Sequence, residues 1–459
     1  MTHTLFDLLE NTGLLKGDKV NRDAVSSTKQ SELLDIATQA GDLTSAASIG
    51  TANSIYTHTA SLSLSGGPWP CSGMKCRLSK AHELAQFAAF YSERVFINNG
   101  LASLARGSKN SPTSNIQRGF LRELEIIAVL RPLIEAGIIV PVATPPRLCF
   151  HCLGKSALSE EDRSKFDRSL KKLSRRFANE TEITLEYDSD KRLQLHITGN
   201  EELVEHGSMW RNRKDLAKQV AENKGLLKKL TANGVAKLPR SLRERLEVDK
   251  EFAHIWFSNI GFEMGVSQCL KTSVVTSKPL EVDILSDFFS SSSINRRNAL
   301  IQRHLTCMVP FLDAITPTEL LAMRNGEADA FISFRHTFAK AIDEHLKSKA
   351  GQITEADAKA IFHDVIEPEL ARMNRKVVSA SKSILRKSGA GLMGWAAAIS
   401  AGLYFGVVES SLISAARALG LTKVAADLAT GLMASSGEEA IRNENMYFLW
   451  KVRHRAGQD

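Results

Sequence analysis

Residues 181–197 read TEITLEYDSDKRLQLHI and contain the clearest β pattern of the chain. Apolar and polar residues alternate on both sides of Asp188-Ser189-Asp190, which is typical of two strands joined by a short polar turn. The pattern predicts a β-hairpin at about 182–198. Beyond it, apolar residues recur at helical spacing to the C-terminus. The sequence therefore predicts a mainly α, multi-helical fold with one small β-hairpin.

Three helices are predicted before the hairpin, at 78–97, 116–137 and 159–177. Ser79 is the expected N-cap of the first. A break is expected near Arg131, because proline at 132 lacks a backbone donor, and an extended piece should follow at 138–142. The stretch SLSLSGGPWPC at 61–71 predicts a short strand or extended segment at 62–65 that ends in a turn.

The chain has 459 residues, more than one hydrophobic core usually serves. Composition divides it into a Ser-, Thr- and Ala-rich segment at 1–66, an α-rich domain with the hairpin at 67–280, and a helical domain at 281–459. The six cysteines are too sparse for a disulfide scaffold and should be reduced. The first residues include acids and lack the pattern of a secretory signal, so we expect a cytoplasmic protein.

Positive charge is concentrated in two stretches. The formal net charge is +8, and residues 207–250 hold 12 Lys and Arg against 5 Asp and Glu, while 371–387 holds six bases and no acid. The first stretch is predicted to contact a polyanion such as nucleic acid, or an acidic partner protein; a solvated helix face is the alternative. The bases expected to make these contacts are Arg211, Arg213, Lys214, Lys224, Lys228, Lys229 and Arg243.

The cysteines include two closely spaced pairs. Cys149-Phe-His-Cys152 resembles half of a zinc knuckle, and Cys71 and Cys76 offer two further thiols. Four thiolates can hold one zinc ion, so these four residues are candidate zinc ligands. Reduced pairs without metal are the alternative, and no other cofactor is expected.

Other chemical signals are weaker. Gly154-Lys155-Ser156 matches the end of a phosphate-binding loop, but Cys149 stands where that loop needs glycine. Acid pairs such as Glu123 and Glu125 are interpreted as solvated carboxylates. We therefore expect a binding protein rather than an enzyme.

One spacing resembles a nuclease motif. Arg297, Asn298 and His304 stand on a predicted helix, and positions seven apart share a face. The pattern resembles the RxxxxxxH motif of HEPN ribonucleases, in which arginine and histidine act on the scissile RNA phosphate. The resemblance implies a ribonuclease with Arg297 and His304 as catalytic residues. An exposed helix with ordinary side chains is the favoured interpretation.

Residues 388–408, SGAGLMGWAAAISAGLYFGVV, contain no charge. The run is long enough for a bilayer span and follows the basic stretch at 371–387. Its many glycines and alanines make it weakly apolar, and 410–433 contains three charges. We therefore predict that 388–433 forms a buried helical hairpin, in which small residues at every fourth position from Gly394 to Gly406 allow close packing. The alternative is a membrane-acting effector at the inner membrane.

Three phrases are familiar as a set: LRPLIEAGIIVPV followed by CFHC, VPFLDAITPTELLAMRNGEADAFISFR, and ENMYFLWKV. They resemble uncharacterised bacterial proteins of defence or mobile-element loci, over residues from about 84 to the end. The resemblance implies a bacterial accessory protein, such as an antiviral-defence component, and carries no activity across. The leading hypothesis is a cytoplasmic, mainly helical binding protein that contacts a polyanion through 207–250.

Overall fold

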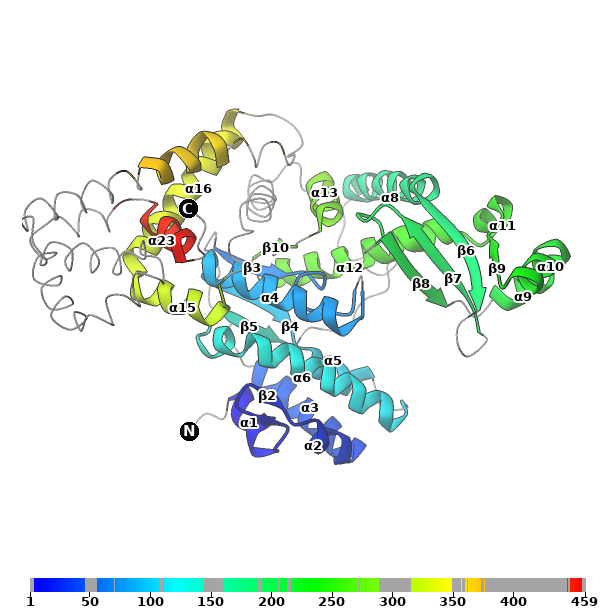
Figure 1. Cartoon of the computed structure of the whole chain (residues 1–459), viewed down its shortest axis with the longest axis horizontal. Coiled ribbons are helices and arrows are strands. Elements are labelled where there is room, and N and C mark those ends of the chain that lie inside the picture. Colours follow the sequence, from blue (N-terminus) through cyan, green and yellow to red (C-terminus); the bar gives the residue numbers. More distant parts are fainter. Residues whose placement is uncertain are drawn as a thin grey trace, which may run out of the picture. The chain divides into compact units, whose positions relative to one another are not determined.

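A computed structural model describes most of the chain before residue 289 and parts of the remainder. The described residues are 4–45, 56–69, 71–107, 111–143, 160–187, 192–204, 207–212, 216–270, 272–276, 278–288, 315–348, short pieces between 356 and 375, 444 and 446–455. Contacts group the chain into two compact units. Figure 1 labels their helices and strands. The first comprises Met1–Ala85 and Ser92–Ala299, and the second Gln86–Tyr91 and Leu300–Asp459. The three-part division by composition stays a prediction.

The first unit contains a four-stranded parallel sheet. Its strands lie in the order β10-β3-β4-β5 and span Ser273–Val275, Thr57–Ala60, Arg94–Asn98 and Ile139–Val142. β3, β4 and β5 follow one another in sequence and lie side by side, whereas β10 joins the other edge of β3. Open parallel sheets bind ligands outside the carboxyl ends of their strands, near the point where the strand order reverses. The carboxyl edge of this sheet is therefore the first place to look for a site.

Polar residues build the strand at this reversal. β3 reads Thr57-His58-Thr59-Ala60 and is buried along its length. His58 Nδ1 lies 2.9 Å from Ser273 Oγ of β10, which satisfies a polar side chain across the sheet. β3 lacks the alternation of apolar and polar residues that predicts a strand. The strand is therefore predicted at 62–65, a few residues after its position at Thr57–Ala60. Residues 62–66 form turns instead of the predicted strand.

Helices connect the parallel strands. Along the chain, α4 (Met74–Phe90) separates β3 from β4, α5 (Gly100–Gly107) and α6 (Thr113–Glu135) separate β4 from β5, and α12 (Val248–Leu270) precedes β10. α12 contacts β3 and β10, while α6 contacts β5. An N-terminal cluster shares an apolar core with α5 and α6. It consists of α1 (Leu5–Asn11), β1 (Leu15–Lys16), β2 (Lys19–Val20), α2 (Arg22–Ser27) and α3 (Gln30–Ser45).

Two predicted helices have different bounds in the structure. α6 continues through Pro132 without the break predicted near Arg131, and Leu130 and Leu133 on either side are fully buried. The helix predicted at 78–97 begins at Met74, so Ser79 is an internal residue rather than the N-cap. It ends at Phe90, and the residues after it form β4, a short apolar strand that helical spacing alone cannot distinguish from a helix end. The extended piece predicted after α6 is confirmed as β5.

The predicted β-hairpin is confirmed. β6 (Thr181–Tyr187) pairs antiparallel with β7 (Leu193–Gly199), with Leu185 opposite Leu195. The hairpin belongs to a larger sheet in the order β8-β7-β6-β9, with β8 (Ser208–Asn212) and β9 (Val235–Lys237) at its edges. The mainly helical fold class is thus confirmed, and its single hairpin is corrected to two four-stranded sheets and one two-stranded sheet among the described residues.

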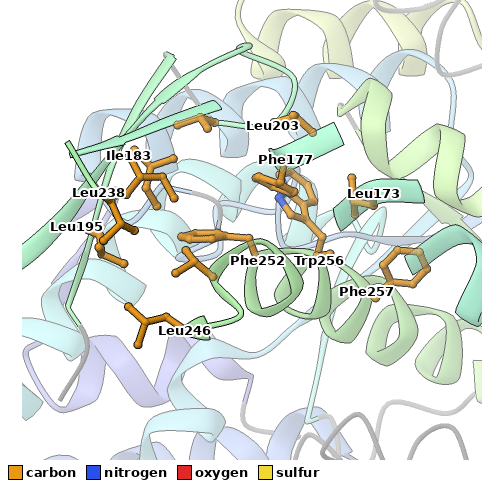
Figure 2. Close-up of a cluster of buried hydrophobic side chains, with 14 of the residues drawn as sticks. Leu173, Phe177, Ile183, Leu195, Leu203, Leu238, Leu246, Phe252, Trp256 and Phe257 are labelled. Atoms are coloured by element: carbon orange, nitrogen blue, oxygen red, sulfur yellow. The ribbon is translucent and has the colours of Figure 1, made fainter. Parts of the chain in front are cut away.

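α8 (Glu160–Glu180) and α12 cover one face of the antiparallel sheet (Figure 2). Ile183 and Leu195 of the sheet face Phe252 of α12, which stacks on Phe177 of α8 with ring centroids 5.6 Å apart. The core holds these helices against the sheet by apolar burial. Further helices of this unit are α9 (Leu216–Ala221), α10 (Lys224–Asn233), α11 (Arg240–Arg245) and α13 (Pro279–Phe288).

The second unit is helical where it is described. Its elements are α15 (Pro317–Gly326), α16 (Ala328–Ser348), the π-helix η3 (Phe362–Ile366) and α23 (Tyr447–Arg455). Phe90 at the end of α4 packs on Phe334 of α16 and Phe448 of α23, with centroid distances of 5.1 and 6.0 Å. Aromatic packing therefore joins the end of α4 to α16 and α23.

Among the helices that the structure describes, none has the length and apolar character needed to cross a membrane. The run at 388–408 and the segment at 410–433 lie outside the described residues. Both the buried helical hairpin and the membrane alternative stay predictions.

Candidate functional site

A cavity of about 310 Å³ lies at the carboxyl ends of β3, β4 and β5, and we call it the edge cavity. Its walls come from the loop after β3, the end of β4, the first turns of α5, the middle of α6 and the last residues of β5. The lining residues are Leu62, Ser65, Gly66, Gly67, Pro68, Ile97, Asn98, Asn99, Gly100, Ser103, Leu104, Glu123, Ile126, Ile127 and Pro141.

The loop at 61–68, which we call the β3 loop, needs glycine where it passes α6. Gly66 has φ +75°, a left-handed conformation that other residues rarely adopt. A Cβ atom there would also lie 2.9 Å from Ile126 Cδ1. The backbone of the β3 loop thus comes close to α6 and closes one wall of the edge cavity.

Arg77 of α4 and Glu123 of α6 form an ion pair beside the cavity. Arg77 Nη2 donates to Glu123 Oε1 at 2.7 Å, and Arg77 Nε donates to the Gly66 carbonyl oxygen at 2.6 Å. The Arg77 side chain is 3% exposed and that of Glu123 is 19% exposed. Burial raises the pKa of Glu123, although the Arg77 charge and hydrogen bond oppose the rise. The arginine therefore fixes both a carboxylate and the β3 loop.

The other carboxylate oxygen of Glu123 lies against the start of α5. A Cβ atom on Gly100 would come within 1.8 Å of Glu123 Oε2, so only glycine leaves room for the carboxylate. Asn99 caps the helix by accepting a hydrogen bond from the Ala102 N–H at 3.2 Å. The partial positive charge of a helix N-terminus favours an anionic group in this place.

The lining groups suit a ligand that donates hydrogen bonds. Among the described lining residues, Glu123 is the one ionisable side chain, and its carboxylate accepts. Asn98 and Ser103 add amide and hydroxyl groups, and isoleucines at 97, 126 and 127 add apolar walls. Together these groups can orient a ligand by accepting its hydrogen bonds and by apolar contact.

A second carboxylate supports the β3 loop from the β10 side. Glu281 of α13 accepts a hydrogen bond from Ser63 Oγ at 2.5 Å and another from the hydroxyl of Thr276. Its other oxygen, Oε1, is buried and accepts no hydrogen bond from the residues that the structure describes. Burial raises the pKa of Glu281, with the hydroxyl hydrogen bonds opposing the rise. Because Leu62 and Ser65 of the same loop line the cavity, Glu281 helps to position its wall.

The sequence did not identify Glu123 as a functional residue. It was interpreted with Glu125 as a solvated carboxylate, whereas the structure pairs Glu123 with Arg77 and places it at the cavity. Glu125 pairs with the exposed Arg22 and does not line the cavity. The Gly-Gly step at 66–67 was the available signal, and it was interpreted as a turn alone.

The predicted zinc ligands are described only in part. Cys71 and Cys76 are thiols on either side of Gly73, where an added Cβ atom would lie 3.4 and 3.9 Å from their sulfurs. The structure thus brings these two together, and Cys149 and Cys152 lie outside the described residues. In the described part of the chain, no cluster of three or more His, Cys, Asp or Glu side chains is arranged to hold a metal ion. The four-thiolate site stays a prediction.

The predicted polyanion-binding bases occupy different environments. Lys224, Lys228 and Lys229 are exposed on α10. Arg211 pairs with Glu251 at 2.9 Å, and Arg243 is 11% exposed and pairs with Asp249. Arg213, Lys214 and the ribonuclease candidates Arg297 and His304 lie outside the described residues. Of the seven bases, the three lysines of α10 present their charges most openly in the part that is described.

Comparison with known proteins gives no relative: no family model, curated protein or solved structure matches this chain.

Proposed function

We propose that the edge cavity binds the ribosyl group of a nucleoside or nucleotide. The observation that carries this proposal is the carboxylate of Glu123, held by Arg77 at a cavity on the carboxyl edge of an open parallel sheet. A carboxylate in such a place can accept hydrogen bonds from ribose hydroxyls. The cavity volume of about 310 Å³ lies at the lower end of the range of small-molecule sites, about 300 to 1,000 Å³.

The β3 loop supports a ribosyl contact more than a pyrophosphate contact. Gly66 and Gly67 let the backbone lie close to a ligand, but Pro68 follows and the loop does not carry the spacing G-x-G-x-x-G. The described lining residues also include no lysine or arginine that could pair with phosphate. The apolar wall at Ile97, Ile126 and Ile127 suits the base ring.

Calorimetric titration of the full chain with adenosine, guanosine, adenosine monophosphate and NAD tests the proposal. Binding of at least one probe is expected, and Glu123→Gln should weaken it by about tenfold or more, because a hydrogen bond to a charged acceptor is lost. Glu125→Gln is the matched control on the same helix and should leave affinity unchanged. Failure of all four probes to bind, or equal affinity of both variants, would contradict the proposal.

Polyanion contact is the second proposed function, and the exposure of Lys224, Lys228 and Lys229 on α10 favours it. Such contact should weaken steeply as salt rises. The membrane and ribonuclease alternatives concern residues that the structure does not describe and stay predictions. Fractionation of cells tests the first, and cleavage activity after His304→Ala tests the second.

A further inference from the structure

The two faces of α8 differ sharply in character. Leu170, Leu173 and Phe177 are buried in the core shared with the antiparallel sheet. The exposed face carries Arg168, Lys171, Lys172 and Arg175. Relative to the first, these four residues stand at positions +3, +4 and +7, which lie on one face of a helix. They therefore form one stripe about two helical turns long. Apolar packing therefore fixes the helix and holds four positive charges toward solvent.

Few acids oppose this stripe. Between Asp167 and Glu180 the helix has five bases and two acids. Glu180 is already paired with Arg176 at 2.9 Å, and Arg176 also pairs with Glu202 at 2.9 Å. The hydrogen bond from Arg176 lowers the pKa of Glu180, which keeps that pair charged. Arg176, Glu180 and Glu202 together carry one net negative charge and Asp167 adds another, so the four bases of the stripe still exceed these acids by two charges.

The stripe borders a shallow depression of about 410 Å³ on α8. Besides the four stripe residues, Arg176, Asn179 and Glu180 line it. A depression flanked by guanidinium, ammonium and amide donors can receive phosphate oxygens, because these groups donate hydrogen bonds and carry positive charge. Both the shape and the positive charge of this depression therefore favour an anionic ligand.

From this arrangement we infer that the exposed stripe of α8, formed by Arg168, Lys171, Lys172 and Arg175, binds the phosphate backbone of a nucleic acid. The charges of one DNA strand are spaced about 3.4 Å apart along the duplex axis and the stripe is about 11 Å long, so several of its bases can contact phosphates at once. A helix that lies in a membrane surface usually presents apolar side chains beside its bases. The described outward residues of this stripe are polar, and the apolar ones face the core.

This inference places nucleic-acid contact on a helix that the sequence did not single out. The basic segment at 207–250 contains more bases, but Arg211 already pairs with Glu251, and Arg243 pairs with Asp249 inside the fold. The lysines of α10 are the rival surface. The inference does not depend on the edge cavity, because α8 contributes no residue to it.

Two charge-matched triple variants of the full chain separate the surfaces. The α8 variant carries Lys171→Glu, Lys172→Glu and Arg175→Glu, and the α10 variant carries Lys224→Glu, Lys228→Glu and Lys229→Glu. Both change the net charge equally at exposed helical positions. Fluorescence anisotropy is measured with a labelled DNA duplex of about 20 base pairs between about 50 and 200 mM salt. Single-stranded RNA, duplex RNA, polyglutamate and anionic lipid vesicles are the other probes.

The α8 variant should bind at least one nucleic-acid probe at least about tenfold more weakly than the unaltered chain, and its logarithmic salt slope should be smaller by about 2.7 if the probe is duplex DNA. The α10 variant removes the lysines of the second proposed function, so it should also lose some affinity, but at least about threefold less than the α8 variant loses. If both variants lost affinity equally, binding would depend on net charge alone, and the inference would be overturned. Unchanged binding by the α8 variant, or binding of the unaltered chain only to polyglutamate or vesicles, would also overturn it. If the α8 variant fails to fold by circular dichroism, the Gln substitutions at the same three positions replace it and the same outcomes apply.

Discussion

The carboxylate of Glu123 lies so close to Gly100 that a Cβ atom on that glycine would come within 1.8 Å of Oε2. Glu123 Oε1 is fixed by Arg77 at 2.7 Å, so the carboxylate is held between a buried arginine and the first residue of α5. A change at Glu123, Arg77 or Gly100 should therefore alter the edge cavity.

Gly100→Ala should push the Glu123 carboxylate away from the start of α5. The added methyl group would lie 1.8 Å from Oε2, so the carboxylate must move, and this movement strains its bond to Arg77. We expect the free energy of unfolding to fall by about 1 to 3 kcal/mol, the usual cost of overpacking. Urea denaturation measures the loss.

Gly326→Ala is the control for this prediction. An added Cβ atom at Gly326 meets no atom within 4 Å, and the residue ends α15. Because alanine is the better helix former, this variant should be neutral or slightly more stable. If Gly100→Ala denatured at the same urea concentration as Gly326→Ala, the close approach of Glu123 to Gly100 would be refuted.

Arg77→Met should destabilise the protein by removing the donor that Glu123 and the β3 loop share. Removing the arginine leaves a half-buried carboxylate without its partner and the Gly66 carbonyl without its donor. We expect a loss of about 3 kcal/mol, the scale for breaking a buried ion pair from one side. The double variant Arg77→Met with Glu123→Gln should recover part of that loss, because no unpaired charge remains. A double-mutant cycle measures the coupling, and strictly additive losses would argue against the pair.

Glu281→Gln should raise stability near neutral pH. Burial raises the pKa of Glu281 in the folded protein above its unfolded value, so the folded state binds more protons. The free energy of unfolding contributed by this group therefore falls as pH rises from about 4.5 through the folded pKa. The glutamine variant keeps the size of the side chain and removes this decline. Thermal melts from acid to neutral pH measure it, with the exposed Glu32→Gln as control. A variant that melts lower than the unaltered protein at neutral pH would oppose this account.

His58 should make the free energy of unfolding fall as pH decreases, which is opposite to the effect of Glu281. Burial lowers its pKa from 6.5 to about 3, so the unfolded chain binds the extra proton. Its contribution to the free energy of unfolding is complete above pH 6.5 and is lost as pH falls toward about 3. His58→Gln should flatten this acid-side loss, whereas the exposed His82→Gln should not. Melts of the two variants across the same pH range compare them directly.

The strands of this fold differ in how far the sequence predicts them. The hairpin around Leu185 and Leu195 is evident because its alternation and its turn are both local. β3 is missed because Thr57, His58 and Thr59 resemble a surface segment until Ser273 and its neighbours, more than 200 residues away, supply their hydrogen bonds. β9 has only three residues, fewer than a periodic pattern needs.

The site is less predictable than the fold. Glu123 and Glu125 are chemically alike and two positions apart, yet their partners, Arg77 and Arg22, lie 46 and 103 residues away in sequence. Local pattern cannot tell which acid lines the cavity when the deciding contact is tertiary. The same limit made Arg243 a candidate for a surface role.

Arg243 gives the sharpest contrast between sequence and structure. It was predicted to contact a polyanion, but its guanidinium donates to the Phe177 carbonyl at 2.7 Å, the Thr181 carbonyl at 2.8 Å and the Asp249 carboxylate. These contacts join α11 to the end of α8 and the start of β6. They leave the side chain 11% exposed, so the group stabilises the fold.

Arg243→Ala should therefore lower the free energy of unfolding by about 3 kcal/mol, because Asp249 and two carbonyl groups lose their donor. Arg240→Ala on the same helix is the control: its side chain is 84% exposed and pairs with Glu244, so its removal should cost little. Chemical denaturation compares the two variants. Below its unfolding transition, the Arg243→Ala protein should bind duplex DNA with unchanged affinity, since the guanidinium is already engaged inside the fold. A variant that kept full stability but lost DNA binding would return Arg243 to the surface role that the sequence suggested.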